Sequence, residues 1–278
     1  MHQKPFGTNV CITGASSGIG LACAQLFSQQ GYQVWGVSRS GTSNVPLPSS
    51  VHLSSMDVTQ DDSVEAKVNC IWKEALEATG DGIGTVIHCA GFGIGGPAED
   101  TPLESIYNQF ETNYFGVVRV NRAFLPLMRS RGAGTVLVLG SIAGRLSIPY
   151  QSHYSSSKFA LEAYVEALRM ESSQFGIRSC IIEAGDTATA FTGRRAVVTP
   201  EASPYAQEAL RAIAKMEHDE KSGYPAHTVA KKVLQVAAKR NPPVRAVVGF
   251  SYSLLMALKR VFPDRLTEWI LRRMYLGR

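Results

Sequence analysis

The chain has 278 residues and a mass of 30.1 kDa, with 45% hydrophobic and 18% charged residues. This composition is globular, and such a length can bury a sizeable core without disulfides or a structural metal. The formal net charge is +5, but the segment from Lys239 to the end holds nine Lys and Arg against two Asp and Glu, a net of +7 that leaves −2 for the rest. The charge therefore gives the body of the chain no general affinity for nucleic acid.

Short β-branched runs alternate with longer amphipathic stretches over the first 190 residues. We expect strands at residues 9–13, 32–37, 51–55, 85–89, 134–139 and 177–183, and helices at 18–30, 61–79, 103–129 and 154–174. Because the strands are continuously apolar, both of their faces should be covered. The pattern predicts a single Rossmann-like, doubly wound α/β fold, with a parallel sheet and helices on both faces.

The alternation breaks after Gly185. Residues 186–225 predict a substrate lid with one helix near 205–217, followed by a helix at 227–239 and a strand at 244–248. Residues 251–275 predict two amphipathic helices separated at Pro263. We therefore divide the chain into a dinucleotide-binding and catalytic domain over residues 1–250 and a C-terminal helical extension over 251–278.

Cysteine and histidine spacing argues against a metal site. The five cysteines form no CxxC pair, and the six histidines are scattered without ligand spacing. We expect neither a metal nor a disulfide framework, and a reducing compartment such as the cytoplasm. The sequence starts without a signal peptide and has no apolar run of about 18 residues, so no spanning helix is expected.

Residues 13–20, Thr-Gly-Ala-Ser-Ser-Gly-Ile-Gly, join the first expected strand to the first expected helix. Glycine allows a tight turn and a close approach of backbone to phosphate, and a helix N-terminus presents free N–H groups to an anion. At this place in an α/β pattern, the turn predicts a dinucleotide phosphate site.

Further motifs follow in chain order: His88-Cys89-Ala90-Gly91, Asn113, Ser141, Tyr154-Ser-Ser-Ser-Lys158, and Glu183-Ala184-Gly185 with Thr189. Together with the glycine turn, they resemble the classical short-chain dehydrogenase/reductase family over about residues 8–250. Three short segments, at residues 91–97, 124–128 and 154–162, resemble its hydroxysteroid and retinol dehydrogenase branch. The chain departs from the family pattern at Cys89, where the family usually has Asn, and at Ala184, where it usually has Pro.

The resemblance implies a catalytic set of Asn113, Ser141, Tyr154 and Lys158. Tyr154 and Lys158 are four residues apart on an expected helix and so share one face, which lets the ammonium bring the pKa of the phenol closer to neutral pH. Ser141 would hydrogen-bond the carbonyl oxygen of the substrate. The family gives Asn113 the role of holding a water behind Lys158 as a proton relay.

The end of the second expected strand favours NADP(H). It carries Ser38 and Arg39 where NAD-binding members have an acidic residue, and a guanidinium can bind the 2′-phosphate. The alternative is that Arg39 is an ordinary exposed loop arginine. The resemblance assigns cofactor contacts to Gly14, Ser16, Ser17, Gly18, Ile19, Gly20, Ser38, Arg39, Asp57, Val58, Cys89, Ala90, Gly91, Tyr154, Lys158, Gly185, Thr187 and Thr189.

The expected cleft is flanked by apolar or small residues at 92–96, 146–150 and 188–191, which favours a bulky lipophilic alcohol or ketone, although the same residues also suit core packing. The alternatives are a 3-oxoacyl-thioester reductase and a non-catalytic NADP(H)-binding redox sensor. The sensor reading is disfavoured because Tyr154 and Lys158 are both present.

Two parts of the sequence suggest contacts with larger partners, one with a second copy of the chain and one with a membrane. Leu161, Tyr164, Val165 and Leu168 suggest a homodimer or homotetramer built on the helices at 103–129 and 154–174. The apolar and basic residues of the extension fit weak peripheral attachment to a membrane, but the same pattern favours a helix packed over the cleft or on a partner subunit, because helices of soluble proteins are amphipathic by default.

Overall fold

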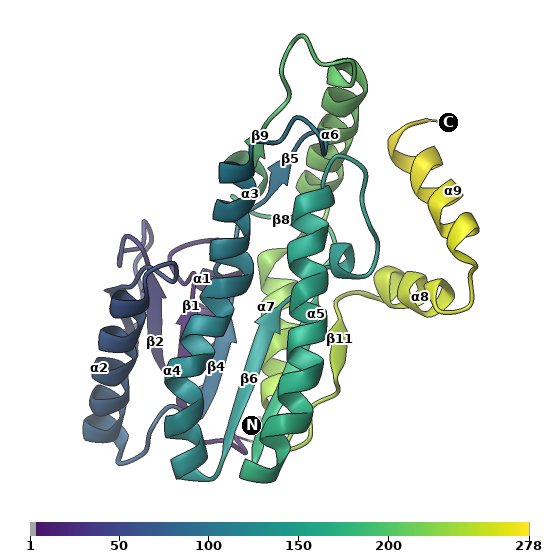
Figure 1. Ribbon diagram of the computed structural model, residues 1–278. Helices are drawn as coiled ribbons and strands as arrows, with labels where there is room; N and C mark the ends of the chain where they lie inside the picture. The colour runs from purple at the N-terminus through teal and green to yellow at the C-terminus, as the bar shows by residue number, and fades with distance from the viewer. Residues whose placement is uncertain (1–3, 278) are drawn as a thin grey trace.

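A computed structural model describes residues 4–277. Its main sheet contains β1 (Asn9–Thr13), β2 (Gln33–Ser38), β3 (Val51–Ser55), β4 (Thr85–His88), β6 (Gly134–Leu139), β7 (Ile177–Glu183) and β11 (Arg245–Val247). The seven strands are all parallel and run in the order β11-β7-β6-β4-β1-β2-β3 (Figure 1). The strand order reverses direction between β4 and β1, which creates the crevice where doubly wound sheets bind ligands.

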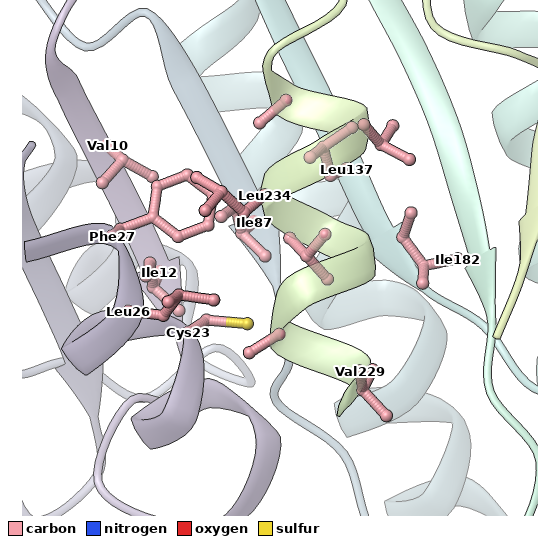
Figure 2. Close-up of a cluster of buried hydrophobic side chains, with 14 of the residues drawn as sticks. Val10, Ile12, Cys23, Leu26, Phe27, Ile87, Leu137, Ile182, Val229 and Leu234 are labelled. Atoms are coloured by element: carbon pink, nitrogen blue, oxygen red, sulfur yellow. The ribbon is translucent and has the colours of Figure 1, made fainter. Parts of the chain in front are cut away.

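Helices cover both faces of this sheet (Figure 1). One face carries α1 (Gly18–Gln29) and α7 (Ala226–Ala237), and the other carries α2 (Asp61–Thr79), α4 (Gly116–Arg131) and α5 (Ser152–Ser172). Figure 2 shows the first of these layers, where Phe27 and Leu234 meet between α1, α7 and the sheet. The strands are apolar on both sides because each side faces a helical layer. The predicted fold class is confirmed.

The long helix expected at 103–129 is interrupted. It consists of α3 (Leu103–Phe110), a π-helical turn over Glu111–Phe115, and α4. Such single π turns inside helices occur frequently at functional sites. Asn113 lies within this one.

The segment at 186–225, called the substrate loop below, contains more structure than the sequence indicates. It holds α6 (Ala206–Lys221), a 3₁₀ turn at Thr192–Arg194, and the short strands β8 (Thr187–Ala188), β9 (Ala196–Val197) and β10 (Tyr224–Pro225). β8 pairs with β10, and β9 pairs with β5 (Ile94–Gly95). Strands of two residues are too short to give an alternating pattern, so the sequence does not predict them.

The residues chosen to support self-association do not form an exposed surface. Leu161, Val165 and Leu168 are buried within the chain; Leu161 and Val165 belong to the core between α5 and the sheet, and Tyr164 is partly buried against that core. Exposed large apolar side chains on α3, the π turn and α5 are different ones: Leu103, Tyr107, Phe115, Phe159 and Met170. The argument from Leu161, Val165 and Leu168 is therefore wrong, because burial against the sheet already accounts for them.

The chain ends in two helices, α8 (Phe250–Lys259) and α9 (Asp264–Tyr275), which lie at a wide angle to each other (Figure 1); this pair is called the C-terminal hairpin below. It lies beside the body of the molecule, with its turn at Pro263 as expected (Figure 1). α9 has no buried residue, whereas Met256 of α8 packs against Ile142 and Leu146. Among the helices of residues 4–277, none is long and apolar enough to cross a bilayer.

Candidate active site

The glycine turn between β1 and α1 is built for close backbone approach. Gly14 has a φ of +69°, and a Cβ there would lie 2.8 Å from the backbone nitrogen of Ala90. A Cβ on Gly20 would lie 2.3 Å from the carbonyl oxygen of Gly14. No side-chain hydrogen bond caps the N-terminus of α1, which follows Ser17. Its free N–H groups and positive dipole end form an anion site, and the residues present fit a dinucleotide phosphate.

At the strand-order reversal, the side chain of Thr13, the first residue of the glycine motif, makes contacts that the sequence did not predict. The Thr13 hydroxyl accepts hydrogen bonds from the backbone N–H groups of Cys89 and Ala90, each at 3.2 Å. A Cβ on Gly91 would lie 3.1 Å from Oδ1 of Asn113. The loop after β4 is thus held against the glycine turn. A hydroxyl residue ending the first strand was the available signal.

At the end of β2, the Ser38 hydroxyl accepts from the Gly41 N–H at 3.1 Å, and the Arg39 carbonyl accepts from the Ser55 hydroxyl at 2.9 Å. The Arg39 side chain is exposed and has no ion-pair partner among the described residues. Asp57, after β3, accepts from the N–H and the hydroxyl of Thr59 at 2.9 and 2.8 Å. Its neighbour Val58 is buried.

The structure brings together three of the four residues expected to be catalytic. Ser141 follows β6, its hydroxyl accepts from the Ala143 N–H at 3.1 Å, and it lies near enough to the phenol of Tyr154 to lower the pKa of that phenol. Tyr154 and Lys158 lie on successive turns of α5. The Lys158 ammonium lies 5.8 Å from the centre of the Tyr154 ring and donates to the Leu139 carbonyl at 2.9 Å.

Burial governs the ionisation of this pair in the protein alone. It raises the pKa of Tyr154 to about 12, against the opposing hydrogen bond from Ser141, and it lowers the pKa of Lys158 to about 8. The expected lowering of the Tyr154 pKa by Lys158 is therefore absent here. The phenol is protonated at neutral pH, which is the form that donates a proton.

Asn113 holds parts of the site together. Its amide donates to the Phe92 carbonyl at 3.0 Å and to the Ser157 hydroxyl at 3.2 Å, and its oxygen accepts from the Phe92 N–H at 3.1 Å. The side chain therefore ties the loop after β4 to α5. Both of its polar ends already have protein partners, so its role in a water relay stays a prediction.

The substrate loop reaches over Tyr154. The Phe191 ring lies 5.8 Å from the Tyr154 ring, centre to centre, and a Cβ on Gly93 would lie 2.9 Å from Phe191. The turn at Thr192–Arg194 is anchored by Glu220 of α6, which forms an ion pair with the buried Arg195 and accepts from the Thr192 hydroxyl at 2.6 Å. Sequence reasoning missed this anchor because its partners are 25 or more residues apart.

The remaining cofactor candidates lie where β7 leads into the substrate loop. The Thr187 hydroxyl donates to the Gly185 carbonyl at 2.9 Å, and the Thr189 hydroxyl accepts from the Phe191 N–H at 3.2 Å. A Cβ on Gly18 would lie 3.6 Å from Thr189, so this threonine borders the phosphate turn. Gly185 instead packs against the Tyr252 ring of α8, where a Cβ would lie 2.3 Å from Cε2.

An apolar cavity of about 80 Å³ lies between the C-terminal hairpin and the body. Ile142, directly after Ser141, forms part of one wall, and Asp186 and Asp219 supply two carboxylates. The Tyr252 hydroxyl donates to Asp186 at 2.5 Å and accepts from its N–H at 3.1 Å, which fastens α8 to the substrate loop. The other lining residues are Leu146, Ile148, Tyr252, Leu255, Lys259, Phe262, Thr267, Ile270, Leu271, Met274 and Tyr275.

Comparison with known proteins places these features in context. Residues 8–197 match the family model described as short chain dehydrogenase. The chain is 37% identical over 269 residues to a 3-ketodihydrosphingosine reductase of Bacteroides thetaiotaomicron, covering 96% of this chain and 97% of that one. It is 32% identical over 275 residues to retinol dehydrogenase 8 of Bos taurus, covering 92% and 86%.

Solved structures agree with the fold. A short-chain dehydrogenase from Streptomyces avermitilis superposes with a TM-score of 0.77 at 28% identity, covering 95% of this chain and 96% of that one. Other solved short-chain dehydrogenases of this fold are complexes with NAD or with NADP.

Proposed function

Because this chain belongs to the short-chain dehydrogenase family, we propose that it is an NADP(H)-dependent alcohol dehydrogenase or carbonyl reductase for secondary alcohols and ketones. The observation that carries the proposal is the grouping of the buried Tyr154 with Lys158, whose ammonium lies 5.8 Å from the centre of the Tyr154 ring, and with Ser141, which lowers the pKa of the Tyr154 phenol, in a fold that also has an uncapped glycine turn at the N-terminus of α1. This set holds an acid, a hydrogen-bond donor and a cation around a single reacting oxygen.

The bound nicotinamide supplies the hydride for reduction or accepts it in oxidation. Tyr154 gives its phenolic proton to the carbonyl oxygen in reduction and takes it back in oxidation. Ser141 donates a hydrogen bond to the same oxygen as negative charge develops there. The ammonium of Lys158 stabilises the phenolate left on Tyr154 and binds the ribose hydroxyls.

We assign NADP(H) as the cofactor because the end of β2 lacks an acidic residue and carries the exposed Arg39, which has no ion-pair partner within residues 4–277. The guanidinium would bind the 2′-phosphate, with the hydroxyls of Ser16, Ser17 and Ser38 as further donors. Asp57 would meet the adenine, and the loop at Cys89–Gly91 would lie against the adenosine and nicotinamide halves. These contacts follow the family pattern at matching positions of the chain.

The substrate that we propose is bulky and lipophilic. We place its apolar part in the cavity between the C-terminal hairpin and the body, which is mostly apolar and has Ile142, the residue after Ser141, in its lining. The names of the two relatives, a retinol dehydrogenase and a 3-ketodihydrosphingosine reductase, support this class. Residues 1–250 would then carry the chemistry, and the extension would complete the substrate site.

A substrate panel tests the proposal. NADPH absorbance would be followed with 3-ketodihydrosphingosine, retinoids, steroids, short aliphatic ketones and 3-oxoacyl thioesters. We expect the highest kcat/KM with a lipophilic compound. Ile270→Trp, which places a larger side chain in the cavity wall, should raise KM for that compound and leave short ketones unaffected. Preference for a 3-oxoacyl thioester, or equal effects on both substrates, would overturn the substrate assignment.

We further propose a cytoplasmic homodimer or homotetramer with weak attachment to anionic membranes. Exposed Leu103, Tyr107 and Met170 on α3 and α5 support self-association. On the C-terminal hairpin, exposed Phe250, Leu254, Val261 and Trp269 lie among basic side chains, which supports contact with a lipid surface.

A further inference from the structure

A cation of the substrate loop reaches the phosphate turn. Nη1 of Arg194 donates a hydrogen bond to the Ser17 hydroxyl at 3.0 Å, across 177 positions of sequence. Ser17 is the residue that immediately precedes α1, where the free N–H groups of the helix begin. Arg194 therefore brings a guanidinium of the substrate loop to this turn.

The electrostatics of this contact are unfavourable without an anion. A helix N-terminus carries partial positive charge, and the first turn of α1 contains no acidic residue. Within residues 4–277, Arg194 has no ion-pair partner either. Two positive groups thus face the same small region, and a phosphate between them would satisfy both.

The backbone segment that carries Arg194 is held in place by further contacts of the substrate loop. It is the last residue of the 3₁₀ turn, whose first residue, Thr192, is bonded to Glu220, and its neighbour Arg195 is buried in an ion pair with the same carboxylate. One residue before the turn, Phe191 lies against Tyr154. A single short segment therefore spans from the reacting tyrosine to the phosphate turn.

We propose that Arg194 binds a phosphate of the dinucleotide and so couples cofactor binding to the closing of the substrate loop. The inference rests on the proposed function, since it needs the dinucleotide in that turn. The ligand chemistry is a phosphate, either of the pyrophosphate or at the 2′ position. The residue differs from Arg39, which lies at the end of β2 rather than on the loop over the substrate.

Nucleotide affinity tests this without relying on activity. Dissociation constants for NADPH and NADH would be measured by nicotinamide fluorescence for wild type, Arg194→Ala and Arg194→Lys. Arg211→Ala, which removes another exposed arginine of the substrate loop, is the matched control. We expect Arg194→Ala to weaken binding roughly tenfold, ~1.4 kcal/mol, Arg194→Lys to restore most of it, and the control to match wild type.

The two nucleotides locate the phosphate. Equal losses for NADPH and NADH assign Arg194 to the pyrophosphate, and a loss for NADPH alone assigns it to the 2′-phosphate. Hydrogen exchange over residues 186–225 should slow on NADPH binding in wild type and respond less in Arg194→Ala. Wild-type affinity in Arg194→Ala would overturn the inference alone. A wild-type protein that binds neither nucleotide would overturn the proposed function along with it.

Discussion

His88 provides a prediction about stability that comes directly from its surroundings. It ends β4, is buried, and its Nε2 lies 2.8 Å from the amide oxygen of Asn121. Burial lowers the pKa of His88 from 6.5 to about 4, and the hydrogen bond to Asn121 opposes this only in part. The ring is therefore neutral in the folded protein at a pH where the unfolded chain would bind a proton.

The direction and the size of the pH effect on the unfolding free energy follow from proton linkage. Between about pH 6.5 and pH 4 the unfolded chain holds one more proton than the folded one, so the contribution of His88 is complete above that window and is lost as the pH falls through it. The full window corresponds to about 3 kcal/mol of unfolding free energy, and the step from about pH 7 to pH 5 to about 2 kcal/mol.

The test compares the unfolding free energy in urea at these two pH values for wild type, His88→Asn and His227→Asn. Asparagine is neutral at both, so His88→Asn should lose about 2 kcal/mol less than wild type on acidification. His227 is exposed, and its replacement should keep the wild-type loss. Identical losses in wild type and His88→Asn would refute the reasoning.

Four further outcomes check the functional assignments. Tyr154→Phe should lower turnover by at least about a thousandfold while still binding NADPH, because only the proton donor is removed; near-normal turnover would show the assignment to be wrong. Arg39→Asp should shift the ratio of kcat/KM values from NADPH towards NADH, since a carboxylate repels the 2′-phosphate; an unchanged ratio would place that phosphate elsewhere. Sedimentation at micromolar concentration should give a dimer or tetramer, and a monomer would exclude the proposed association. A chain ending at Gly249 should pellet less with anionic vesicles than the full chain, and equal pelleting would count against attachment through the tail.

The sequence predicted the sheet because its strands are long apolar runs with turn residues on either side. The bounds of β1, β3, β6 and β7 agree with the expected ranges, and the glycine turn lies where backbone crowding at Gly14 and Gly20 requires it. In such cases the local pattern and the packing demand the same residues.

The features that the sequence did not predict depend on packing and on contacts between residues far apart in the chain. The buried pair of Arg195 and Glu220 joins two positions of the substrate loop that carry no common motif. The pKa of Tyr154 depends on its burial, which spacing to Lys158 does not reveal. The apolar residues of α5 were correctly identified, but the sequence does not say that the sheet, rather than a second subunit, covers Leu161 and Val165.

The C-terminal hairpin tolerates substitutions that the glycine turn does not. α9 has no buried residue, so most substitutions there change the stability of the fold little, whereas a side chain added at Gly14 or Gly20 collides with backbone. Ile270, Leu271 and Met274 nevertheless line the cavity. If the cavity holds the substrate as proposed, substitutions in the last 30 or so residues can change its lining at little cost to the fold, while the glycine turn stays constrained.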